Sequence, residues 1–325
     1  MKRLEGEVLI TGGAGFLGRA ILRRARDEEW PAKITVVSRD PQKHHAAADE
    51  FPGVQWVVGD VCDSIEMEEL ILGKNVVIHA AALKHIPEAE LAPTSAIRIN
   101  VLGSLTVLHA AIQAEVPHIV AVSTDKACHP VNVYGATKFQ MERMFQTAAR
   151  FSGTQIHLVR YGNVIGSTGS VVQVWREMVR KQGFVNATDP NMTRFWLTAE
   201  HAVSLLLFSL SEPSGTITIP VLRATAMGDV LDWLFPDAAG HVFGGLRPGE
   251  KTHEMLITPQ EGPFAERRTA DGTPLASFVS EFIRLWPVTG KAREGPSSFP
   301  DGFTSDDAEP WNKPEFLAIV NQLEP

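Results

Sequence analysis

The chain has 325 residues, enough for one large α/β domain or for such a domain with a smaller lobe. Its net charge of −8, from 30 basic and 38 acidic residues, argues against nucleic acid as the main partner. No apolar run approaches the length of a membrane span, and the first residues carry no signal-peptide core, so we expect a cytoplasmic protein. The two cysteines give no disulfide framework and have no partner at zinc-ligand spacing, so no metal is expected.

The first strand is predicted over residues 7–11, and a glycine-rich loop and a helical pattern through Arg26 follow it. Glycines at three-residue spacing in this loop allow a tight turn, close approach of the backbone to a pyrophosphate and close helix–strand packing. A lone glycine triplet is weak evidence, but this one stands between a first strand and a first helix. We therefore predict that the loop holds a dinucleotide through Gly12, Ala14, Gly15, Phe16, Leu17 and Gly18.

The second strand, over residues 33–37, is followed by Ser38, Arg39 and Asp40. An acidic side chain at this point usually binds the ribose hydroxyls of NAD, whereas a guanidinium can grip the 2′-phosphate of NADP. Arg39, with Ser38 before it and Lys43 nearby, favours NADP; Asp40 is the residue that argues for NAD. The alternative is a turn of surface charges without a cofactor role.

The third strand, over residues 54–59, ends beside Asp60 and Val61. The Asp60 carboxylate can accept a hydrogen bond from the adenine amino group, while the backbone amide of Val61 donates one to the adenine ring. The fourth strand, over residues 76–79, runs into Ala80, Ala81 and Ala82, whose small side chains would let the backbone approach the cofactor ribose and phosphate.

Two polar residues after the fourth strand have alternative interpretations. Lys84 would reach the cofactor or the substrate, or would only solvate its loop together with His85. Asn100 lies in a long helix predicted over residues 93–116, either as a polar anchor of the core or as a contact to the active-site strand.

The fifth strand, over residues 118–122, leads into a segment rich in reactive side chains. Residues 124–126, Thr-Asp-Lys, stand where the strand meets its loop, the usual ligand position in an open α/β sheet. Tyr134 and Lys138 are four residues apart and share one face of a helix, where the ammonium favours loss of the phenolic proton. Alone, this pair could be a solvated helix face; the neighbouring carboxyl, amine and hydroxyls favour a catalytic site.

The character of the sequence changes after a sixth strand over residues 155–160. A glycine-rich loop over residues 162–170 offers amides suited to a phosphate or a sugar, and a turn over residues 247–251 offers a cation for a diphosphate. Residues 259–310 are rich in Gly, Pro, Ser and charge, so we expect them to be irregular and partly mobile. Helices are predicted over residues 133–151, 171–181, 199–210 and 313–323.

The alternation of strands and helices predicts an α/β fold: a Rossmann-type, doubly wound parallel sheet with a smaller C-terminal lobe. We expect residues 1–165 to form the dinucleotide-binding domain, which carries the Tyr–Lys pair. Residues 166–325 should mainly form the substrate-binding lobe, with some segments returning to the Rossmann core.

Together these motifs resemble the extended short-chain dehydrogenases/reductases that act on nucleotide sugars, and among them the inverting UDP-N-acetylglucosamine 4,6-dehydratases. The resemblance covers roughly residues 7–257 and includes a Thr-Asp-Lys triplet, where dTDP-glucose-type dehydratases typically have Thr-Asp-Glu. Departures at Cys62, at Cys128-His129 and at Gln173, where the family often has Pro, touch the substrate edge and leave the acid–base set intact. The matching stretches are residues 38–40, 59–61, 79–85, 123–127, 134–138, 160–164, 192–196 and 247–251.

The resemblance implies a hydro-lyase that regenerates its nicotinamide cofactor and starts the route to pseudaminic-acid-type sugars. Tyr134, with its pKa lowered by Lys138, would take the C4 hydroxyl proton, and Ser123 or Thr124 would hydrogen-bond the O4 atom. Lys126 would remove the C5 proton, while Asp125 would act as an acid on the C6 hydroxyl. A free lysine has a pKa of about 10.4, so this base would need desolvation or nearby positive charge.

The resemblance also assigns binding residues and an assembly. Relatives associate through helices that flank the sheet, so a homo-oligomer is expected. Thr188, Arg247 and Glu250 could instead be structural. Besides the glycine loop and the 38–43 segment, the cofactor residues are Asp60, Val61, Ala80, Ala81, Ala82, Lys84, Asn100, Ser123, Tyr134, Lys138 and Val164. The UDP-sugar residues are Lys84, Asn163, Gly169, Ser170, Val171, Val172, Gln173, Thr188, Arg247 and Glu250.

Two rival functions remain open at this stage. A UDP-hexose 4-epimerase or another nucleotide-sugar oxidoreductase needs Tyr134 and Lys138 but not the Asp125–Lys126 pair, so loss of water from the product separates the two activities. A regulator or scaffold built on an inactive dehydrogenase would bind NADP and turn over nothing; the intact Tyr, Lys and Asp argue against it.

Overall fold

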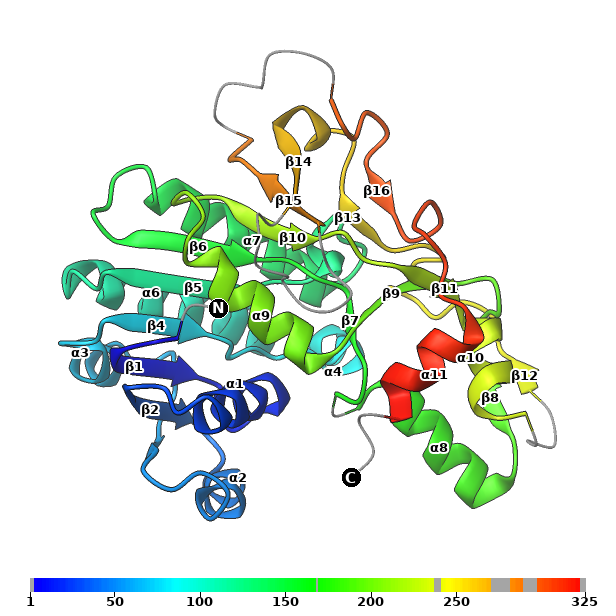
Figure 1. Ribbon diagram of the computed structural model, residues 1–325, viewed down its shortest axis with the longest axis horizontal. Helices are drawn as coiled ribbons and strands as arrows, with labels where there is room; N and C mark the ends of the chain where they lie inside the picture. The colour runs from blue at the N-terminus through cyan, green and yellow to red at the C-terminus, as the bar shows by residue number, and fades with distance from the viewer. Residues whose placement is uncertain (1–2, 168, 237–240, 270–280, 289–296, 322–325) are drawn as a thin grey trace.

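A nine-stranded sheet forms the centre of the larger part of the molecule in the computed structural model (Figure 1). The structure describes residues 3–167, 169–236, 241–269, 281–288 and 297–321. Seven neighbouring strands are parallel, in the order β3-β2-β1-β4-β5-β6-β10, which is the doubly wound order of dinucleotide-binding sheets. They are β1 (Gly6–Thr11), β2 (Ala32–Ser38), β3 (Gln55–Val58), β4 (Val76–His79), β5 (His118–Val122), β6 (Gln155–Val159) and β10 (Ile217–Pro220).

These strands form because their side chains are apolar on both faces of the sheet. In β4 every residue is buried, and in β1 the last four are, as expected for parallel strands that helices cover on both sides. The sheet confirms the predicted α/β class. The order of the strands reverses between β1 and β4, so their carboxyl ends form the crevice in which such folds bind ligands.

Helices cover the two faces of this sheet. Helices α1 and α9 pack against each other on one face, while α3, α6 and α7 contact one another on the other (Figure 1). The bounds of the helices are α1 (Phe16–Asp27), α2 (Pro41–Ala48), α3 (Ser64–Ile71), α4 (Ile86–Leu91), α5 (Pro93–Ile97), α6 (Ser104–Gln113), α7 (Val133–Ala148), α8 (Val171–Gln182), α9 (Ala199–Ser209), α10 (Met227–Leu234) and α11 (Lys313–Asn321).

The long helix predicted over residues 93–116 is interrupted. A π-helical turn, η1 (Arg98–Gly103), joins α5 to α6, and such turns are frequent at functional sites. Contrary to the expectation from the sequence, the whole segment Pro93–Gln113 is long and apolar enough to cross a membrane by length and composition. Because 56% of its apolar window is buried inside the protein, where α3 and α7 contact it, packing in the core accounts for its composition.

The segment predicted to be irregular contributes strands to the sheet. Strand β15 (Glu281–Leu285) pairs antiparallel with β10, and β14 (Ala265–Thr269) pairs antiparallel with β15. Phe282, Ile283 and Leu285 are buried, so apolar side chains hold this edge in place. The prediction was wrong here because short strands surrounded by turn-forming residues give a weak sequence signal. Two parts of the segment, 270–280 and 289–296, lie outside the described residues.

A second buried cluster lies apart from the main sheet and includes Trp175, Trp196 and Phe316. It is built by α8, α10 and α11 with short strands beside them (Figure 1). The predicted boundary between residues 165 and 166 stays a prediction. The remaining elements are β7 (Asn163–Val164), β8 (Val185–Ala187), β9 (Thr193–Leu197), β11 (Ala224–Ala226), β12 (His241–Phe243), β13 (Met255–Ile257), β16 (Phe303–Thr304) and the 3₁₀ turns η2 (Asp125–Ala127) and η3 (Gly262–Phe264).

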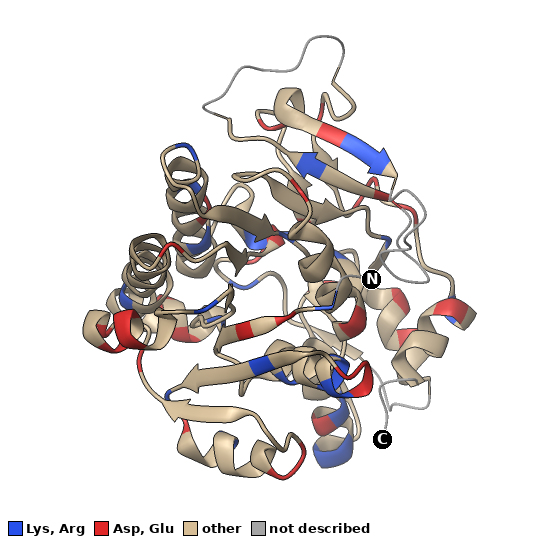
Figure 2. Cartoon of the chain, turned by 60° about the vertical axis from the view of Figure 1, so that its left-hand side comes forward, with Lys and Arg blue, Asp and Glu red and all other residues tan. Residues whose placement is uncertain are grey.

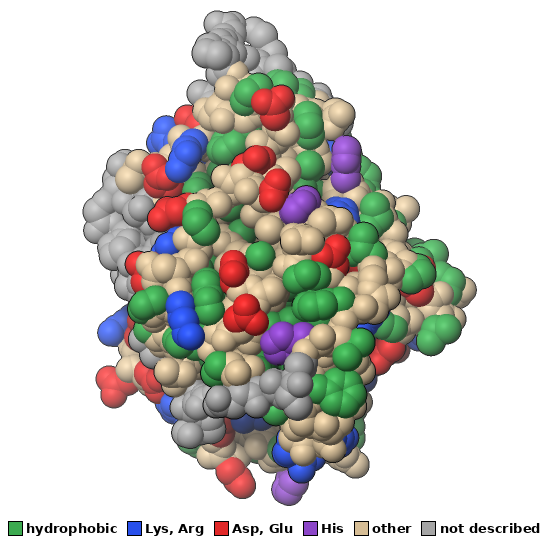
Figure 3. Space-filling view, turned by 90° about the vertical axis from the view of Figure 1, so that its right-hand side faces the viewer, with side chains coloured by type: hydrophobic (Ala, Val, Ile, Leu, Met, Phe, Trp, Pro, Cys, Tyr) green, Lys and Arg blue, Asp and Glu red, His purple; other side chains and the backbone are tan. Residues whose placement is uncertain are grey.

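Charge is mixed over the surface. Lysine and arginine alternate with aspartate and glutamate along the helices around the sheet (Figure 2). On the face that carries α8, α10 and α11, acidic and histidine side chains lie among hydrophobic ones (Figure 3).

Candidate active site

The glycine loop leaves room for a diphosphate above α1. Gly12 has a φ of +69°, and a Cβ there would lie 2.8 Å from the backbone of Ala81. A Cβ on Gly18 would lie 2.2 Å from the carbonyl oxygen of Gly13, so helix and loop pack too closely for a side chain. Gly15 begins α1 without a side-chain cap, and the first turn contains no acidic residue. The exposed amides and positive end of this helix fit a dinucleotide diphosphate.

The end of β2 leaves one guanidinium available. Asp40 caps α2, accepting from the amides of Gln42 (3.0 Å) and Lys43 (3.2 Å), and its carboxylate pairs with the Lys43 amine at 3.4 Å. The hydroxyl of Ser38 lies 2.5 Å from Nε2 of His44. Arg39 is exposed, and no ion pair involves it within the described ranges. The acidic residue that argued for NAD is therefore occupied as a helix cap.

The adenine-side residues predicted from β3 lie at its carboxyl end. The Asp60 carboxylate accepts from the amide of Cys62 at 3.1 Å and pairs with Arg98 at 3.4 Å. Val61 is buried. Ala80, Ala81 and Ala82, after β4, are half-buried beside Gly12, so they line the crevice from its other side.

Asn100 anchors the loop after β4. Its side chain is fully buried, and its amide bonds the backbone N–H (2.8 Å) and C=O (2.9 Å) of Leu83 and the hydroxyl of Thr137 (3.0 Å). These bonds tie the loop after β4 to α7. These contacts support the core-anchor alternative, and the assignment of Asn100 to the cofactor stays a prediction.

A buried acid–base cluster lies at the carboxyl end of β5. Lys126 Nζ donates to Asp125 Oδ1 at 3.0 Å and to Asn163 Oδ1 at 3.4 Å, and it lies 3.4 Å from Glu254 Oε1. The Thr124 hydroxyl caps η2 and donates to Asp125 Oδ1 at 2.9 Å. The side chain of Asp125 is fully buried, that of Glu254 is 4% exposed, and that of Lys126 is 18% exposed. Lys126 is thus the least buried side chain of the three.

The protonation of this cluster follows from its burial and its charges. Burial and the nearby Glu254 raise the pKa of Asp125, although Lys126 opposes the rise. For Lys126, burial alone would lower the pKa, but Asp125 and Glu254 outweigh it and raise the pKa above its usual range. The expectation that desolvation and positive charge lower the pKa of Lys126 is therefore wrong for the ligand-free protein.

Tyr134 and Lys138 share one face of α7, as predicted, but their electrostatic coupling differs from the prediction. Burial raises the pKa of Tyr134 to about 12, and the opposing groups are the Lys126 charge and a hydrogen bond with Thr124. Lys138 points toward Met141, with Nζ 3.0 Å from the sulfur, and burial lowers its pKa to about 8. The cation that lowers the pKa of Tyr134 against the effect of burial is Lys126.

A cavity of about 220 Å³ adjoins this cluster. Six predicted substrate residues line it: Asn163, Gly169, Val171, Thr188, Arg247 and Glu250. Asn163 links the cavity to the Lys126 amine. The sequence analysis missed Val174, Trp175 and Met178, which also line it; their helical spacing after Val171 was the available signal. It also missed Asn186, Ala187, Asp189, Met192, Arg194 and Met227.

Four predicted substrate residues lie elsewhere. Val172 is 2% exposed and packs into the core of the smaller lobe, so its side chain does not line the cavity. Ser170 begins α8 with a buried hydroxyl, and Lys84 is exposed. Gln173 accepts from the amide of Gly169 at 3.3 Å and donates to the carbonyl of Gly166 at 3.0 Å, so it ties together the glycine-rich loop.

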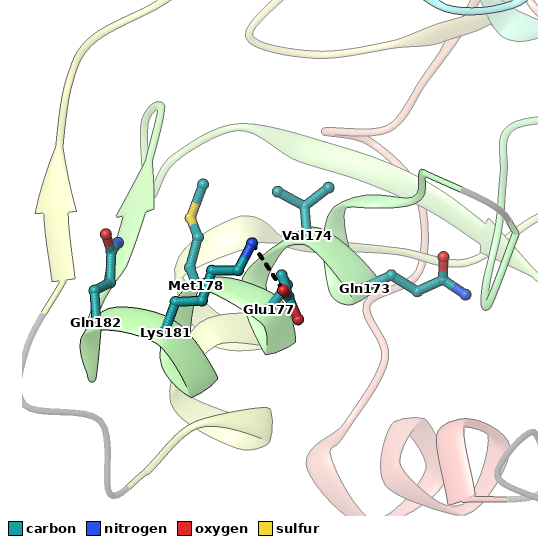
Figure 4. A pocket seen from close by; sticks show the side chains of 6 residues that line it. All are labelled: Gln173, Val174, Glu177, Met178, Lys181 and Gln182. Carbon is teal, nitrogen blue, oxygen red and sulfur yellow. Dashed lines mark ion pairs between the residues drawn. The ribbon is translucent and has the colours of Figure 1, made fainter.

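The outer side of α8 carries a second, wider hollow of about 360 Å³ (Figure 4). Val174 and Met178 line it together with Gln173 and Gln182, and the Glu177–Lys181 ion pair (2.9 Å) crosses it. It lies away from the acid–base cluster, and its charges are already paired. We therefore assign the substrate site to the smaller cavity.

A second buried charged cluster lies beside the first. Arg160 donates to both oxygens of Glu142 (2.9 and 2.7 Å) and of Glu261 (3.0 and 2.8 Å) and also to the carbonyl of Leu256. It contacts the sulfur of Cys128 at 2.9 Å. Burial raises the pKa of the Cys128 thiol well above its ordinary value, so this cysteine is a packed thiol and a poor nucleophile.

Comparison with known proteins places this fold and site in a family. Residues 8–269 match the family described as "Polysaccharide biosynthesis protein". A UDP-N-acetylglucosamine 4,6-dehydratase (inverting) from Campylobacter jejuni is 33% identical over 98% of both chains. A UDP-glucose 4-epimerase from Rickettsia canadensis is 34% identical over 81% of both chains. The crystal structure of Pen from Bacillus thuringiensis superposes with a TM-score of 0.88 at 27% identity, covering 100% of both chains.

The fold and the site define a nucleotide-sugar enzyme of the extended short-chain dehydrogenase/reductase type. The chain belongs to the polysaccharide biosynthesis protein family.

Proposed function

We propose that the chain is a C5-inverting UDP-N-acetylglucosamine 4,6-dehydratase. The observation that carries this proposal is the buried Asp125–Lys126 pair, whose amine donates to Asn163, a residue that lines the cavity together with other predicted substrate residues. An epimerase needs no such pair. The full-length similarity to the Campylobacter jejuni dehydratase supports the same activity.

The enzyme uses a nicotinamide dinucleotide, for which the glycine loop and the uncapped end of α1 provide a fitting cradle. When bound, it would accept hydride from C4 of the sugar and return hydride to C6. Ser123, at the end of β5, has a buried hydroxyl without a hydrogen-bond partner among the described residues, so it is available to a ligand. The cofactor is regenerated in each turnover, so the reaction is a net loss of water.

Tyr134 starts the reaction by taking the proton of the C4 hydroxyl. It must be a phenolate to do so, and its raised pKa means that the ligand-free protein holds the neutral phenol. The positive charge of a bound nicotinamide would add to that of Lys126 and favour the phenolate. The Thr124 hydroxyl, which hydrogen-bonds Tyr134 and donates to Asp125, connects the two groups that exchange protons with substrate.

Elimination requires a protonated acid and a neutral base at the same time. One proton transfer over 3.0 Å, from the Lys126 ammonium to Asp125, produces both. The neutral amine then takes the C5 proton, the Asp125 carboxyl gives its proton to the C6 hydroxyl, and water leaves. For C5 to invert, the returning proton must reach C5 on the face opposite to Lys126. A water molecule can deliver it and take up in turn the proton that Tyr134 received, which leaves Tyr134, Asp125 and Lys126 in their starting states. General acid–base catalysis of this kind is worth roughly 10²–10⁴-fold per group.

We propose NADP as the preferred cofactor, because Arg39 is exposed at the end of β2 while Asp40 is engaged in capping α2. The 2′-phosphate would pair with the Arg39 guanidinium. Titration of the protein with NADP and NAD should give tighter binding of NADP, and Arg39→Ser should remove most of that preference. Equal affinities in the unchanged protein would contradict the assignment.

Product analysis tests the function. Purified protein supplied with the cofactor and UDP-N-acetylglucosamine should yield a 4-keto-6-deoxy sugar with inverted C5, observed by NMR. A product that keeps its C6 hydroxyl and differs only at C4 would establish the epimerase instead. Binding of cofactor without any product would favour a regulator.

We also propose that the protein is a cytoplasmic homo-oligomer. Relatives that associate through helices beside the sheet motivate the assembly, and the composition motivates the compartment. A mass of 35.5 kDa in light scattering, which is that of a monomer, would contradict the proposed oligomer. Recovery of the chain in the membrane fraction of the cells would contradict the proposed compartment.

A further inference from the structure

Glu254 is a buried carboxylate that the fold brings to the acid–base cluster. It precedes β13, and β13 pairs antiparallel with β16 near the C-terminus. The amide of Glu254 donates to the hydroxyl of Ser305 at 2.9 Å, and this hydroxyl also contacts that of Thr193 at 2.6 Å. The backbone of Glu254 is therefore held by two segments that lie far from it in sequence.

The carboxylate of Glu254 faces cations and is incompletely paired. Oε1 lies 3.4 Å from Lys126 Nζ and 3.8 Å from Nε of Arg194, and Oε2 lies 3.9 Å from Lys251 Nζ. Oε2 accepts no hydrogen bond from the described residues. Burying a carboxylate with an unbonded oxygen is costly, so a purely structural role explains its position poorly.

Lys126 thus lies between two carboxylates of different character. Asp125 belongs to its own turn, while Glu254 comes from the segment before β13. Among the described residues, Arg194 from β9, Tyr134 from α7 and Lys251, which lies against Glu254, are further titratable or charged groups of this cluster. Asn163 accepts a hydrogen bond from the amine on the cavity side. Without Glu254, the Lys126 amine would keep Asp125 as its one acidic partner among the described residues and Asn163 as a polar one. Nothing would then hold the amine in its present position between them.

We propose that Glu254 is a positioning residue for elimination: it holds the Lys126 amine between Asp125 and the cavity and supplies the negative charge that keeps a proton on the Asp125–Lys126 pair. This inference rests on the proposed function, in which that pair removes the C5 proton and protonates the leaving hydroxyl. Glu254 need not touch the sugar. Its negative charge makes Asp125 and Lys126 both harder to deprotonate.

Glu254→Gln tests this role because it removes the charge and keeps the shape. The acid and base limbs of the kcat–pH profile reflect the coupled titration of Asp125 and Lys126. Loss of the nearby negative charge makes both groups easier to deprotonate, so both limbs should move to lower pH by about one unit. We expect kcat to fall roughly 10- to 100-fold with KM little changed. C4 oxidation, followed by the reduced cofactor, should persist while water loss slows.

Glu266→Gln is the matched control, because Glu266 lies on β14 and pairs with Arg268 and Arg284 away from the cluster. It should leave the profile unchanged. Glu254→Asp keeps the charge on a shorter side chain, so it should retain the wild-type limbs while kcat falls. If Glu254→Gln does not fold, Glu254→Asp decides: slowed elimination with intact C4 oxidation supports the proposal, and an unchanged kcat overturns it.

An unmoved pH profile in folded Glu254→Gln would also overturn the proposal, even if kcat fell, because a merely structural residue would lower the rate without moving the limbs. Failure of the proposed function is distinguishable, because the unchanged protein would then form no dehydrated product at all.

Discussion

Two buried charged clusters lie side by side, and they differ in how fully their groups are bonded. In the cluster of Glu142, Arg160 and Glu261, both oxygens of each carboxylate accept from the guanidinium. In the cluster of Asp125, Lys126 and Glu254, one oxygen of each carboxylate receives no hydrogen bond within the described part of the chain. Both clusters are almost completely buried, so solvent does not explain the difference.

This difference in bonding indicates that one cluster has a structural role and the other a catalytic role. A planar guanidinium with five donors fixes two carboxylates in one geometry and remains charged at every working pH. A lysine amine can give and take its proton, and unbonded carboxylate oxygens can receive one. The first cluster should therefore govern stability, and the second should govern turnover. Each prediction below tests one side of this division.

Asp125→Asn should have the largest effect on turnover. The amide keeps the shape of the acid but cannot protonate the C6 hydroxyl, so kcat for water loss should fall roughly 10²–10⁴-fold. The unfolding midpoint should change little, because burial disfavours the ionised form of Asp125, an amide oxygen can still accept from Thr124 and Lys126, and Lys126 keeps Glu254 as an acidic partner. Steady-state kinetics and thermal unfolding of the same sample check both parts. Unfolding at a much lower temperature would assign Asp125 to structure.

Arg160→Met should have the opposite signature. It leaves Glu142 and Glu261 as buried carboxylates without their cation, which costs about 3–5 kcal/mol of unfolding free energy. Denaturant unfolding measures this loss. Per folded molecule, kcat should stay near that of the unchanged protein. A stability change below about 1 kcal/mol would show that this cluster does not hold the fold.

Acid should act through the same structural cluster. Burial alone would raise the pKa of Glu261, but Arg160 outweighs it and lowers the pKa to about 2 from an ordinary 4.5. A carboxylate with a lowered pKa stabilises the fold above its unfolded pKa, and this stabilisation is lost as pH falls from about 4.5 to about 2. It amounts to on the order of 3 kcal/mol. Unfolding measured across this range should weaken, and Glu261→Gln should flatten that dependence.

The parts of the site that depend on local sequence were predictable. The glycine loop and the Tyr134–Lys138 face of α7 each follow from short-range spacing and from the position of a strand end. Open parallel sheets gather such positions at one edge, so the sequence predicted a shared crevice. The parallel order of the first six strands was predictable for the same reason.

The parts of the site that depend on contacts between distant segments could not be predicted from the sequence. Glu254 follows a recognised motif by only three residues, but nothing local indicates that β13 will lie against η2. The side chain of Asn100 was assigned to a ligand because sequence spacing cannot tell a buried amide from an exposed one. The charge of Lys126 was misjudged for a related reason: its pKa depends on Glu254, a residue that the fold brings close from far along the chain.

The most direct test of the account is deuterium incorporation at C5 in heavy water. The unchanged protein, supplied with UDP-N-acetylglucosamine, should place solvent deuterium at C5 of its dehydrated product, as observed by NMR. Lys126→Ala should still reduce the cofactor slowly but should neither exchange C5 nor release water at a comparable rate. Normal C5 exchange and normal product from Lys126→Ala would contradict the assignment of this amine as the base.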